Sequence, residues 1–237
     1  MSDPLLDIEG LSASYGQAEI LFDVSLRLGR GEVAALMGRN GAGKTTTLKA
    51  IMGLVQRRAA RLVFDGHSIG TLASYRIARL GLGYVPEERR IFTDLTVYEN
   101  LEVGRRPARA GREPWTAERL FRIFPNLAEM QGRRASHMSG GEQQMLTIAR
   151  TLMGNPEAVL LDEPSEGIAP VVVELMAEAI LAMKREGVAV LLCEQNLAFA
   201  SAVCDRAYVI ERGHIRYDGS IAALAEDETL RDAYLSV

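Results

Sequence analysis

The chain has 237 residues, of which 48% are hydrophobic and 24% are charged, an ordinary balance for a globular protein. This length allows a substantial core and predicts one large domain. The formal net charge of −4 argues against a nucleic-acid partner.

Nothing in the sequence predicts export or membrane insertion. The N-terminal residues Met1–Pro4 lack the basic and apolar regions of a signal peptide, and no apolar stretch approaches the roughly 18 residues of a membrane-spanning helix. Cys193 and Cys204 are expected to be reduced thiols of a cytosolic protein and not a disulfide. A role at a membrane would therefore require a partner that spans it.

Short strands and helices alternate in the first part of the predicted structure. Apolar residues fill the strands, and glycines mark the turns between them. The expected elements are strands within 5–37, among them 33–37, a helix over 46–52, a strand over 61–66, a helix over 74–80 and a strand over 81–85.

The middle of the chain, from about residue 90 to 155, has a helical pattern interrupted by a loop near 107–114. A helix over 143–153 ends this part, and Ser139 is suited to be its N-cap. Arginines are frequent here and most simply form a solvated face, with a docking or lipid-proximal surface as the alternative. They are Arg105, Arg106, Arg109, Arg112, Arg119, Arg122, Arg133 and Arg134.

Strands and helices alternate again in the last third of the chain. The expected elements are a strand over 158–162, a helix over 170–186, a strand over 188–193, a helix over 196–203, a hairpin over 207–217 and a helical ending over 221–237. This alternation predicts the α/β class: a core with a mainly parallel sheet, preceded by an N-terminal antiparallel β part and interrupted by a helical subdomain.

One segment predicts a phosphate-binding site. It matches the P-loop pattern G-x-x-x-x-G-K-[ST], lies between a short apolar run and a helix, and would present several backbone N–H groups to an anion at the positive end of that helix. Lys44 can reach the β- and γ-phosphates of a nucleotide, and the Thr45 hydroxyl can ligate Mg²⁺. The residues expected to bind the nucleotide are Gly38, Arg39, Asn40, Gly41, Ala42, Gly43, Lys44, Thr45 and Thr46.

Two further motifs follow in order. Residues 138–144 read Met-Ser-Gly-Gly-Glu-Gln-Gln, in which the glycines let the backbone approach a ligand closely. The apolar run 158–161 leads into Asp162 and Glu163 and looks like a Walker B strand. A P-loop, then Ser-Gly-Gly-Glu-Gln, then a strand ending in Asp-Glu resembles the ATP-binding subunits of ABC transporters over nearly the whole chain.

The resemblance implies a single ABC ATPase domain over 1–237, with residues 1–89 and 156–237 as a RecA-like P-loop NTPase core and about 90–155 as the helical subdomain. It implies ATP and Mg²⁺ as ligands, with Asp162 on the side of the metal and Glu163 as general base or water-orienting group. Such ATPases work in pairs, so the signature residues of one subunit would cap the γ-phosphate held by the other. Those residues are Ser139, Gly140, Gly141 and Glu142.

Tyr15 lies upstream of the P-loop, where the family has an aromatic residue that stacks on adenine. A half-buried strand tyrosine is the alternative. The segment 165–170 occupies the place of the family's D-loop, but its usual aspartate is Ala169 here. A carboxylate contact from this loop across the dimer is therefore less expected.

Two departures from the family pattern narrow the resemblance. Glu87 replaces the usual Q-loop glutamine near Mg²⁺, and Gln195 replaces the usual switch histidine beside the γ-phosphate. Pro86-Glu87-x-Arg-Arg-Ile-Phe together with Glu194-Gln195-Asn196 is similar to the second ATPase of branched-chain amino-acid importers, the LivF type. Importers of urea or short-chain amides remain the alternative, although their loop more often keeps the glutamine.

This resemblance implies a peripheral protein at the cytoplasmic face of the inner membrane. Its partners would be two transmembrane permease subunits, a second similar ATPase in a heterodimer (a homodimer when isolated) and, indirectly, an external solute-binding protein. A soluble ABC ATPase of DNA repair would need long coiled coils, and only about 95 residues separate Lys44 from Ser139, with no sustained heptads. A non-hydrolysing ATP sensor is disfavoured by the intact Lys44, Asp162 and Glu163.

Overall fold

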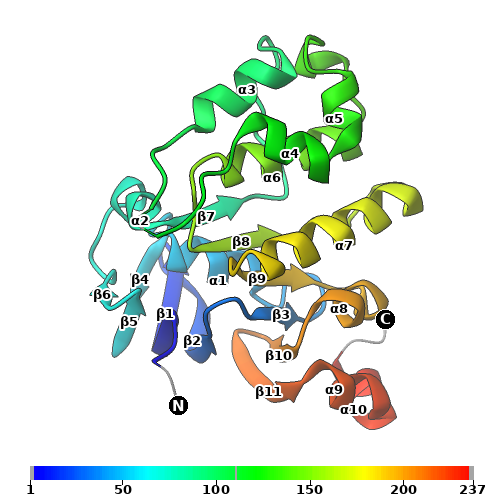
Figure 1. Ribbon diagram of the computed structural model, residues 1–237. Helices are drawn as coiled ribbons and strands as arrows, with labels where there is room; N and C mark the ends of the chain where they lie inside the picture. The colour runs from blue at the N-terminus through cyan, green and yellow to red at the C-terminus, as the bar shows by residue number, and fades with distance from the viewer. Residues whose placement is uncertain (1–2, 110, 235–237) are drawn as a thin grey trace.

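The computed structural model describes residues 3–109 and 111–234, which form two β-sheets and a group of helices (Figure 1). The strands are β1 (Leu6–Tyr15), β2 (Ala18–Leu28), β3 (Val33–Met37), β4 (Gln56–Arg58), β5 (Arg61–Phe64), β6 (His67–Ser68), β7 (Leu82–Val85), β8 (Ala158–Asp162), β9 (Ala189–Glu194), β10 (Arg206–Glu211) and β11 (His214–Ser220). The helices are α1 (Lys44–Ile51), α2 (Ser74–Leu80), α3 (Val97–Gly104), α4 (Ala117–Ile123), α5 (Pro125–Glu129), the 3₁₀ helix η1 (Ala135–His137), α6 (Gly140–Leu152), α7 (Pro170–Arg185), α8 (Leu197–Val203), α9 (Ile221–Glu226) and α10 (Glu228–Tyr234).

The larger sheet has six strands in the order β11-β10-β3-β9-β8-β7, and all neighbouring pairs except β10–β11 are parallel. Every residue of β3, β8 and β9 is buried, which explains their continuous apolar runs: both faces of a parallel sheet are covered. Along β3, Ala35 packs into one hydrophobic cluster and Leu36 into the other. The carboxyl ends of three adjacent strands, β3, β9 and β8, therefore meet at one edge of the sheet.

The smaller sheet is antiparallel and contains β2, β1, β5 and β6 in that order, with β4 paired to β1. It covers α1, which lies between the two sheets: Leu48 and Ile51 of α1 share a cluster with Leu6 and Ile8 of β1 and Leu36 of β3. The helix that follows the P-loop is thus held by apolar contacts on both sides.

Helices α3 to α6 lie together on one side of the larger sheet, above β7 and β8 in the view of Figure 1. Thr96 caps α3 and Ser139 caps α6, each in a capping box with a glutamate three residues on, Glu99 and Glu142. Their apolar residues join those of α7 and the sheet in a single cluster. The expected α/β class with a mainly parallel sheet and an N-terminal antiparallel part is confirmed, while the domain boundaries at 89 and 156 remain a prediction.

Some expected bounds were wrong. Helix α6 begins at Gly140 and not at 143, because Ser139 caps it and two glycines are tolerated in its first turn. Of the described residues, 105–109 and 111–116 form no helix, so the expected loop near 107–114 is longer than predicted, and the short strand β4 was not expected. The C-terminal part forms two helices separated at Asp227, and the end of that prediction, 235–237, lies outside the described residues.

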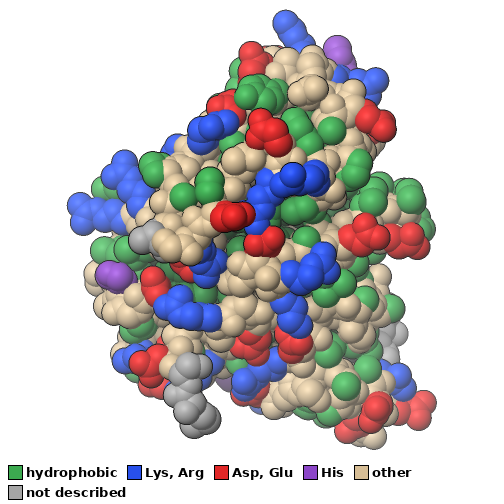
Figure 2. All heavy atoms as spheres, viewed as in Figure 1, with side chains coloured by type: hydrophobic (Ala, Val, Ile, Leu, Met, Phe, Trp, Pro, Cys, Tyr) green, Lys and Arg blue, Asp and Glu red, His purple; other side chains and the backbone are tan. Residues whose placement is uncertain are grey.

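The sequence predicted that no helix spans a membrane and that the arginines form a solvated face. Among the described residues, no helix combines the length and apolar character that crossing a membrane requires. Basic and acidic side chains are interspersed over the face shown in Figure 2. Several of the arginines pair with acids, but Arg112 and Arg119 expose only 33% and 15% of their side chains, so a fully solvated face does not describe these two. The ion pairs are Arg105–Glu102, Arg112–Glu157 and Arg119–Glu186.

Candidate functional site

The P-loop connects β3 to α1 and turns sharply at Gly43, which precedes the helix with φ 116°. Residues other than glycine rarely adopt this backbone conformation, and a β-carbon at Gly43 would lie 2.8 Å from Leu21 Cδ2. Glycine therefore permits the turn that places the first backbone N–H groups of α1 toward the loop. Such a helix start favours an anion.

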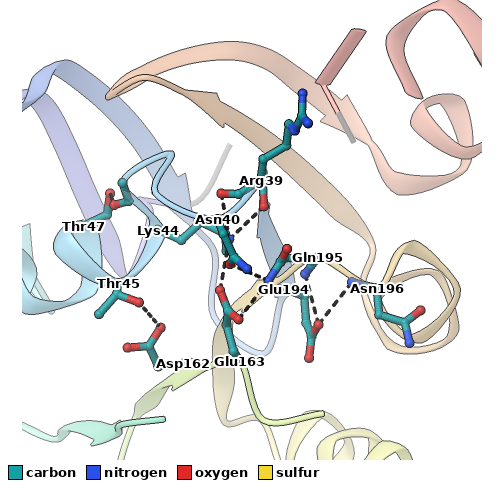
Figure 3. A network of polar contacts seen from close by, with 12 residues as sticks. Arg39, Asn40, Lys44, Thr45, Thr47, Asp162, Glu163, Glu194, Gln195 and Asn196 are labelled. Carbon is teal, nitrogen blue, oxygen red and sulfur yellow. Dashed lines mark hydrogen bonds and ion pairs between the residues drawn. The ribbon is translucent and has the colours of Figure 1, made fainter. Parts of the chain in front are cut away.

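Lys44 is buried, with 3% of its surface exposed. Its Nζ donates hydrogen bonds to the carbonyl oxygens of Gly38, at 2.8 Å, and Arg39, at 3.1 Å, and lies 3.0 Å from Glu163 Oε1 (Figure 3). The loop thus wraps around its own lysine. To bind a phosphate through its ammonium group, Lys44 must exchange at least one of these partners.

Asp162 ends β8 and lies beside the start of α1. The Thr45 hydroxyl donates to Asp162 Oδ1 over 2.9 Å, and the Tyr84 hydroxyl donates to Oδ2 over 3.0 Å. Burial raises the pKa of Asp162, and these two hydrogen bonds oppose the rise. The hydroxyl and carboxylate oxygens are hard donors of the type that Mg²⁺ prefers, so the pair fits this ion as two of its ligands, with substrate phosphates and water supplying the rest.

Glu163 follows β8 directly and has a left-handed backbone conformation, φ 44°, that is uncommon for a non-glycine residue. Its N–H donates to the Cys193 carbonyl over 3.0 Å, which ties the turn to β9. Burial acts to raise the pKa of its carboxyl, but hydrogen bonds with Glu166 and Lys44 outweigh burial and lower the pKa below its usual range. Glu163 is therefore an ionised carboxylate at neutral pH.

Gln195 follows β9, the strand between β3 and β8, so its side chain reaches both neighbours. Its Nε2 donates to Glu163 Oε2 over 3.0 Å and to Asn40 Oδ1 over 2.7 Å (Figure 3). The sequence placed Gln195 at the switch position but did not predict that it would touch the P-loop and Glu163 together. This contact arises because the three strand ends are adjacent.

Glu194, Tyr84 and Glu166 are site residues that sequence reasoning missed. Glu194 is 3% exposed and accepts hydrogen bonds from the backbone N–H groups of Ser165, Gln195 and Asn196, which fixes the two turns on either side of the site. The sequence signal that could have identified Glu194 is its position as an acid at the end of an apolar strand. Its burial raises its pKa.

Glu166 lies one turn beyond Glu163 and donates its backbone N–H to the Glu163 carbonyl over 3.2 Å. A side-chain hydrogen bond with Glu163, burial and the charges of Glu87 and Glu194 raise the pKa of Glu166 to about 7. A small cavity opens beside these acids and is lined by Glu87, Arg89, Gln144, Glu163, Pro164, Glu166 and Ile168.

Glu87 is exposed, and its side chain forms no hydrogen bond or ion pair with the described residues. It lies on the same cavity as Glu163, and no hydrogen bond joins it to Thr45 or Asp162, so its role as a metal ligand remains a prediction. Tyr15 ends β1 with 48% of its surface exposed, and its stacking on adenine also remains a prediction.

The signature residues lie apart from the P-loop of the same chain. The Ser139 hydroxyl accepts from the Glu142 N–H over 3.4 Å, and the Glu142 carboxylate accepts from the Ser139 N–H over 2.6 Å. Among the described residues, no hydrogen bond or ion pair joins 139–142 to 38–46. The structure thus holds two separate groups of predicted site residues: one with a lysine, a hydroxyl–carboxylate oxygen pair and an ionised acid, and one at a capped helix start.

Comparison with known proteins shows that this chain belongs to the ABC transporter family. The ABC transporter family matches residues 21–166. The high-affinity branched-chain amino acid transport ATP-binding protein BraG of Pseudomonas aeruginosa is 42% identical over 231 residues, which cover 98% of this chain and 99% of BraG. The lipopolysaccharide export system ATP-binding protein LptB of Haemophilus influenzae is 36% identical, covering 98% of this chain and 97% of LptB.

Solved structures share the fold. The ADP conformation of an ATP-binding cassette of an ABC transporter superposes with a TM-score of 0.82 at 25% sequence identity, over 98% of both chains.

Proposed function

This chain belongs to the ABC transporter family as an ATP-binding subunit whose ATP hydrolysis drives transport, and we propose that the transport it powers is the import of branched-chain amino acids. ATP hydrolysis is supported by one observation: at the ends of three adjacent strands, four side chains come together. They are Lys44, Asp162, Glu163 and Gln195. The import part rests on the motifs at Glu87 and Gln195 and on the similarity to BraG.

Each residue of this edge has a distinct task in the proposed reaction. Lys44 leaves Glu163 and binds the β- and γ-phosphates, and the helix start at Gly43 contributes backbone N–H groups. Thr45 and Asp162 would hold Mg²⁺, which when bound would supply positive charge to offset that of the phosphates. Tyr15 carries the adenine on its exposed ring.

Glu163 orients and deprotonates the attacking water. Once Lys44 has moved to phosphate, one oxygen of this carboxylate is free to accept from water, while Gln195 still holds the other. Its lowered pKa keeps it ionised at neutral pH, as a base that accepts a proton from water must be.

ABC ATPase subunits work with transmembrane permease partners, and a groove beside α2, β7, α3 and α6 is a suitable docking surface. Exposed Tyr75, Phe92 and Val103 give it an apolar lining, with 55%, 48% and 46% of their surfaces exposed. Arg79, Arg106 and Arg150 line it as well. An acidic, amphipathic segment of a permease subunit would fit this lining, and such docking would keep this chain at the cytoplasmic face of the membrane.

The second ATPase of the complex is a similar chain in a face-to-face heterodimer. The separation of Ser139–Glu142 from the chain's own P-loop supports this arrangement, because each half-site then needs the complementary half of a partner. The helix start at Ser139 caps the γ-phosphate held by that partner.

The experiment is purification of the native complex through a tag on this chain. Its associated solute-binding protein is identified, and ATP hydrolysis by the complex in liposomes is measured with that protein and a panel of solutes. We expect stimulation by leucine, isoleucine and valine. Stimulation by urea or short amides alone would indicate that the complex imports those solutes and not amino acids. Stimulation by lipopolysaccharide without any solute-binding protein would favour an exporter like LptB.

A further inference from the structure

The loop after β7 contains a strained turn, which is held in place by α6, the helix that begins with the signature residues Gly140 and Gly141. Arg89 and Arg90 are consecutive non-glycine residues with left-handed backbones, φ 64° and 50°. A left-handed backbone is unfavourable for a residue with a side chain and persists only where the surroundings fix it. Thr147 Oγ1 donates to the Arg89 carbonyl over 2.8 Å, and Arg150 Nη2 donates to the Arg90 carbonyl over 2.7 Å. Helix α6 thus fixes both strained residues.

This turn places the Arg89 guanidinium against the first residue of α6. A β-carbon at Gly140 would lie 2.5 Å from Arg89 Nη1 and 3.0 Å from Cζ, so the guanidinium occupies the space that a side chain at 140 would need. The Arg89 side chain is half-buried, and it forms no hydrogen bond or ion pair with any residue that the structure describes. Its neighbour Arg90, in contrast, is exposed and lies 3.7 Å from Glu88.

The cavity beside this guanidinium contains a buried polar atom that has no hydrogen-bond partner among the described residues. Gln144 is 3% exposed, lines the same cavity as Arg89, and has its Oε1 without a hydrogen-bond partner among the described residues. The acids Glu87, Glu163 and Glu166 also line the cavity, yet no ion pair joins any of them to Arg89. A half-buried cation with unused N–H groups therefore stands next to the capped N-terminus of a 13-residue helix.

We propose that Arg89 contacts the γ-phosphate of the ATP held by the partner ATPase, in addition to the signature residues at the start of α6. This inference rests on the proposed pairing of two ATPases and adds a residue to it. The backbone N–H groups of α6 supply partial charge, whereas the guanidinium supplies a full charge and fork geometry suited to phosphate oxygens. Gln144 Oε1 can accept from one guanidinium N–H and leave the others for phosphate.

The test uses the native complex with the general-base glutamate of one ATPase replaced at a time. In the Glu163→Gln background only the partner's P-loop site hydrolyses ATP, and there Arg89→Gln should lower kcat about 100- to 1,000-fold, the range for losing one preorganised donor. In the background with the partner's glutamate replaced, Arg89→Gln should lower the residual hydrolysis much less, because Arg89 then serves a site that no longer turns over. Equal losses in both backgrounds, a loss in the second alone, or no loss would overturn the proposal.

A second readout needs no turnover. A complex with both glutamates replaced should retain two ATP molecules through gel filtration, and adding Arg89→Gln should reduce this to one, with Arg89→Lys between the two. Arg90→Gln is the matched control and should retain two. If the complex with Arg89→Gln retains two ATP molecules, the proposed role of Arg89 is wrong, while the pairing of the two sites stands. Failure of the complex with Arg89 intact to retain any nucleotide overturns the paired sites and this proposal together.

Discussion

The side-chain amide of Gln195 donates a 3.0 Å hydrogen bond to Glu163 Oε2, while Lys44 Nζ lies 3.0 Å from the other oxygen of that carboxylate. Glu163 is thus held from two sides. The same Gln195 nitrogen donates to Asn40 of the P-loop, which an amide can do because it carries two N–H groups. Glutamine at this position joins the base and the phosphate-binding loop.

The first prediction concerns this orienting contact. Gln195→Ala should lower kcat about 10- to 100-fold and leave ATP affinity nearly unchanged, because the carboxylate loses its alignment but Lys44 keeps its phosphate contact. Steady-state hydrolysis and ATP binding, measured on the same complex, separate the two effects. A large loss of affinity with normal kcat would show that Gln195 binds nucleotide and does not position Glu163.

The second prediction is that the two ATP sites are unequal. Gln195 cannot carry the positive charge of a histidine, so the site on this P-loop should be slower than one with a switch histidine. Replacing the general base in one ATPase at a time should give unequal losses of turnover, and Gln195→His should raise the rate of this site. Equal losses together with no gain from Gln195→His would defeat this asymmetry.

The third prediction concerns nucleotide binding. Lys44→Ala removes the ammonium group and should weaken Mg-ATP binding, since no other cation occupies the centre of the described P-loop. Calorimetry on the purified chain measures the affinity. Lys49→Ala, a lysine later in α1, serves as the control and should bind ATP normally. Unchanged affinity in Lys44→Ala would contradict the assignment of the loop.

The fourth prediction concerns hydrolysis. Glu163→Gln keeps the size of the side chain but removes the base, so ATP should bind while turnover falls on the order of 100-fold or more. The measurement is single-turnover hydrolysis in the assembled complex. Turnover at the unmodified rate by this site would mean that another group activates the water.

The fifth prediction concerns stability and pH. Asp7 on β1 accepts hydrogen bonds from Arg27 Nε over 2.9 Å and from Arg61 Nε over 2.6 Å, and so links three strands of the smaller sheet. Burial acts to raise its pKa, but the contacts with the two arginines lower it below the ordinary value of 3.8. The carboxylate therefore stabilises the fold above about pH 4, and this stabilisation is lost as the pH falls through the lowered pKa.

Asp7→Asn should reduce the free energy of unfolding at pH 7 by about 1 kcal/mol, a modest value because both arginine side chains are at least half exposed and solvent screens them. Urea unfolding at pH 7 and at pH 3 measures the difference between the two proteins. The difference should shrink at pH 3. A constant difference would show that the charge of Asp7 contributes nothing.

The sequence alone was sufficient for the local chemistry. The P-loop turn, the Ser139 cap and the acids that end β8 are set by residues adjacent in the chain, where steric restrictions of glycine, hydrogen bonding of a capping side chain and apolar periodicity act over a few residues. Where these rules predicted separate bounds, as for β3, α2 and β8, most agree within one or two residues, whereas α3, α4 and α5 were expected only as a helical region. They failed for α6, where the capping of Ser139 outweighed the low helix propensity of Gly140 and Gly141.

Only the tertiary structure decided which of these residues meet. The order β3-β9-β8 brings Lys44, Gln195 and Glu163 into contact although more than 100 residues separate the first from the other two, and the packing of the loop after β7 on α6 brings Arg89 to Gly140. Burial and neighbouring charges then set the pKa of Glu163 and of Glu166, because these effects depend on distances through space and not along the chain.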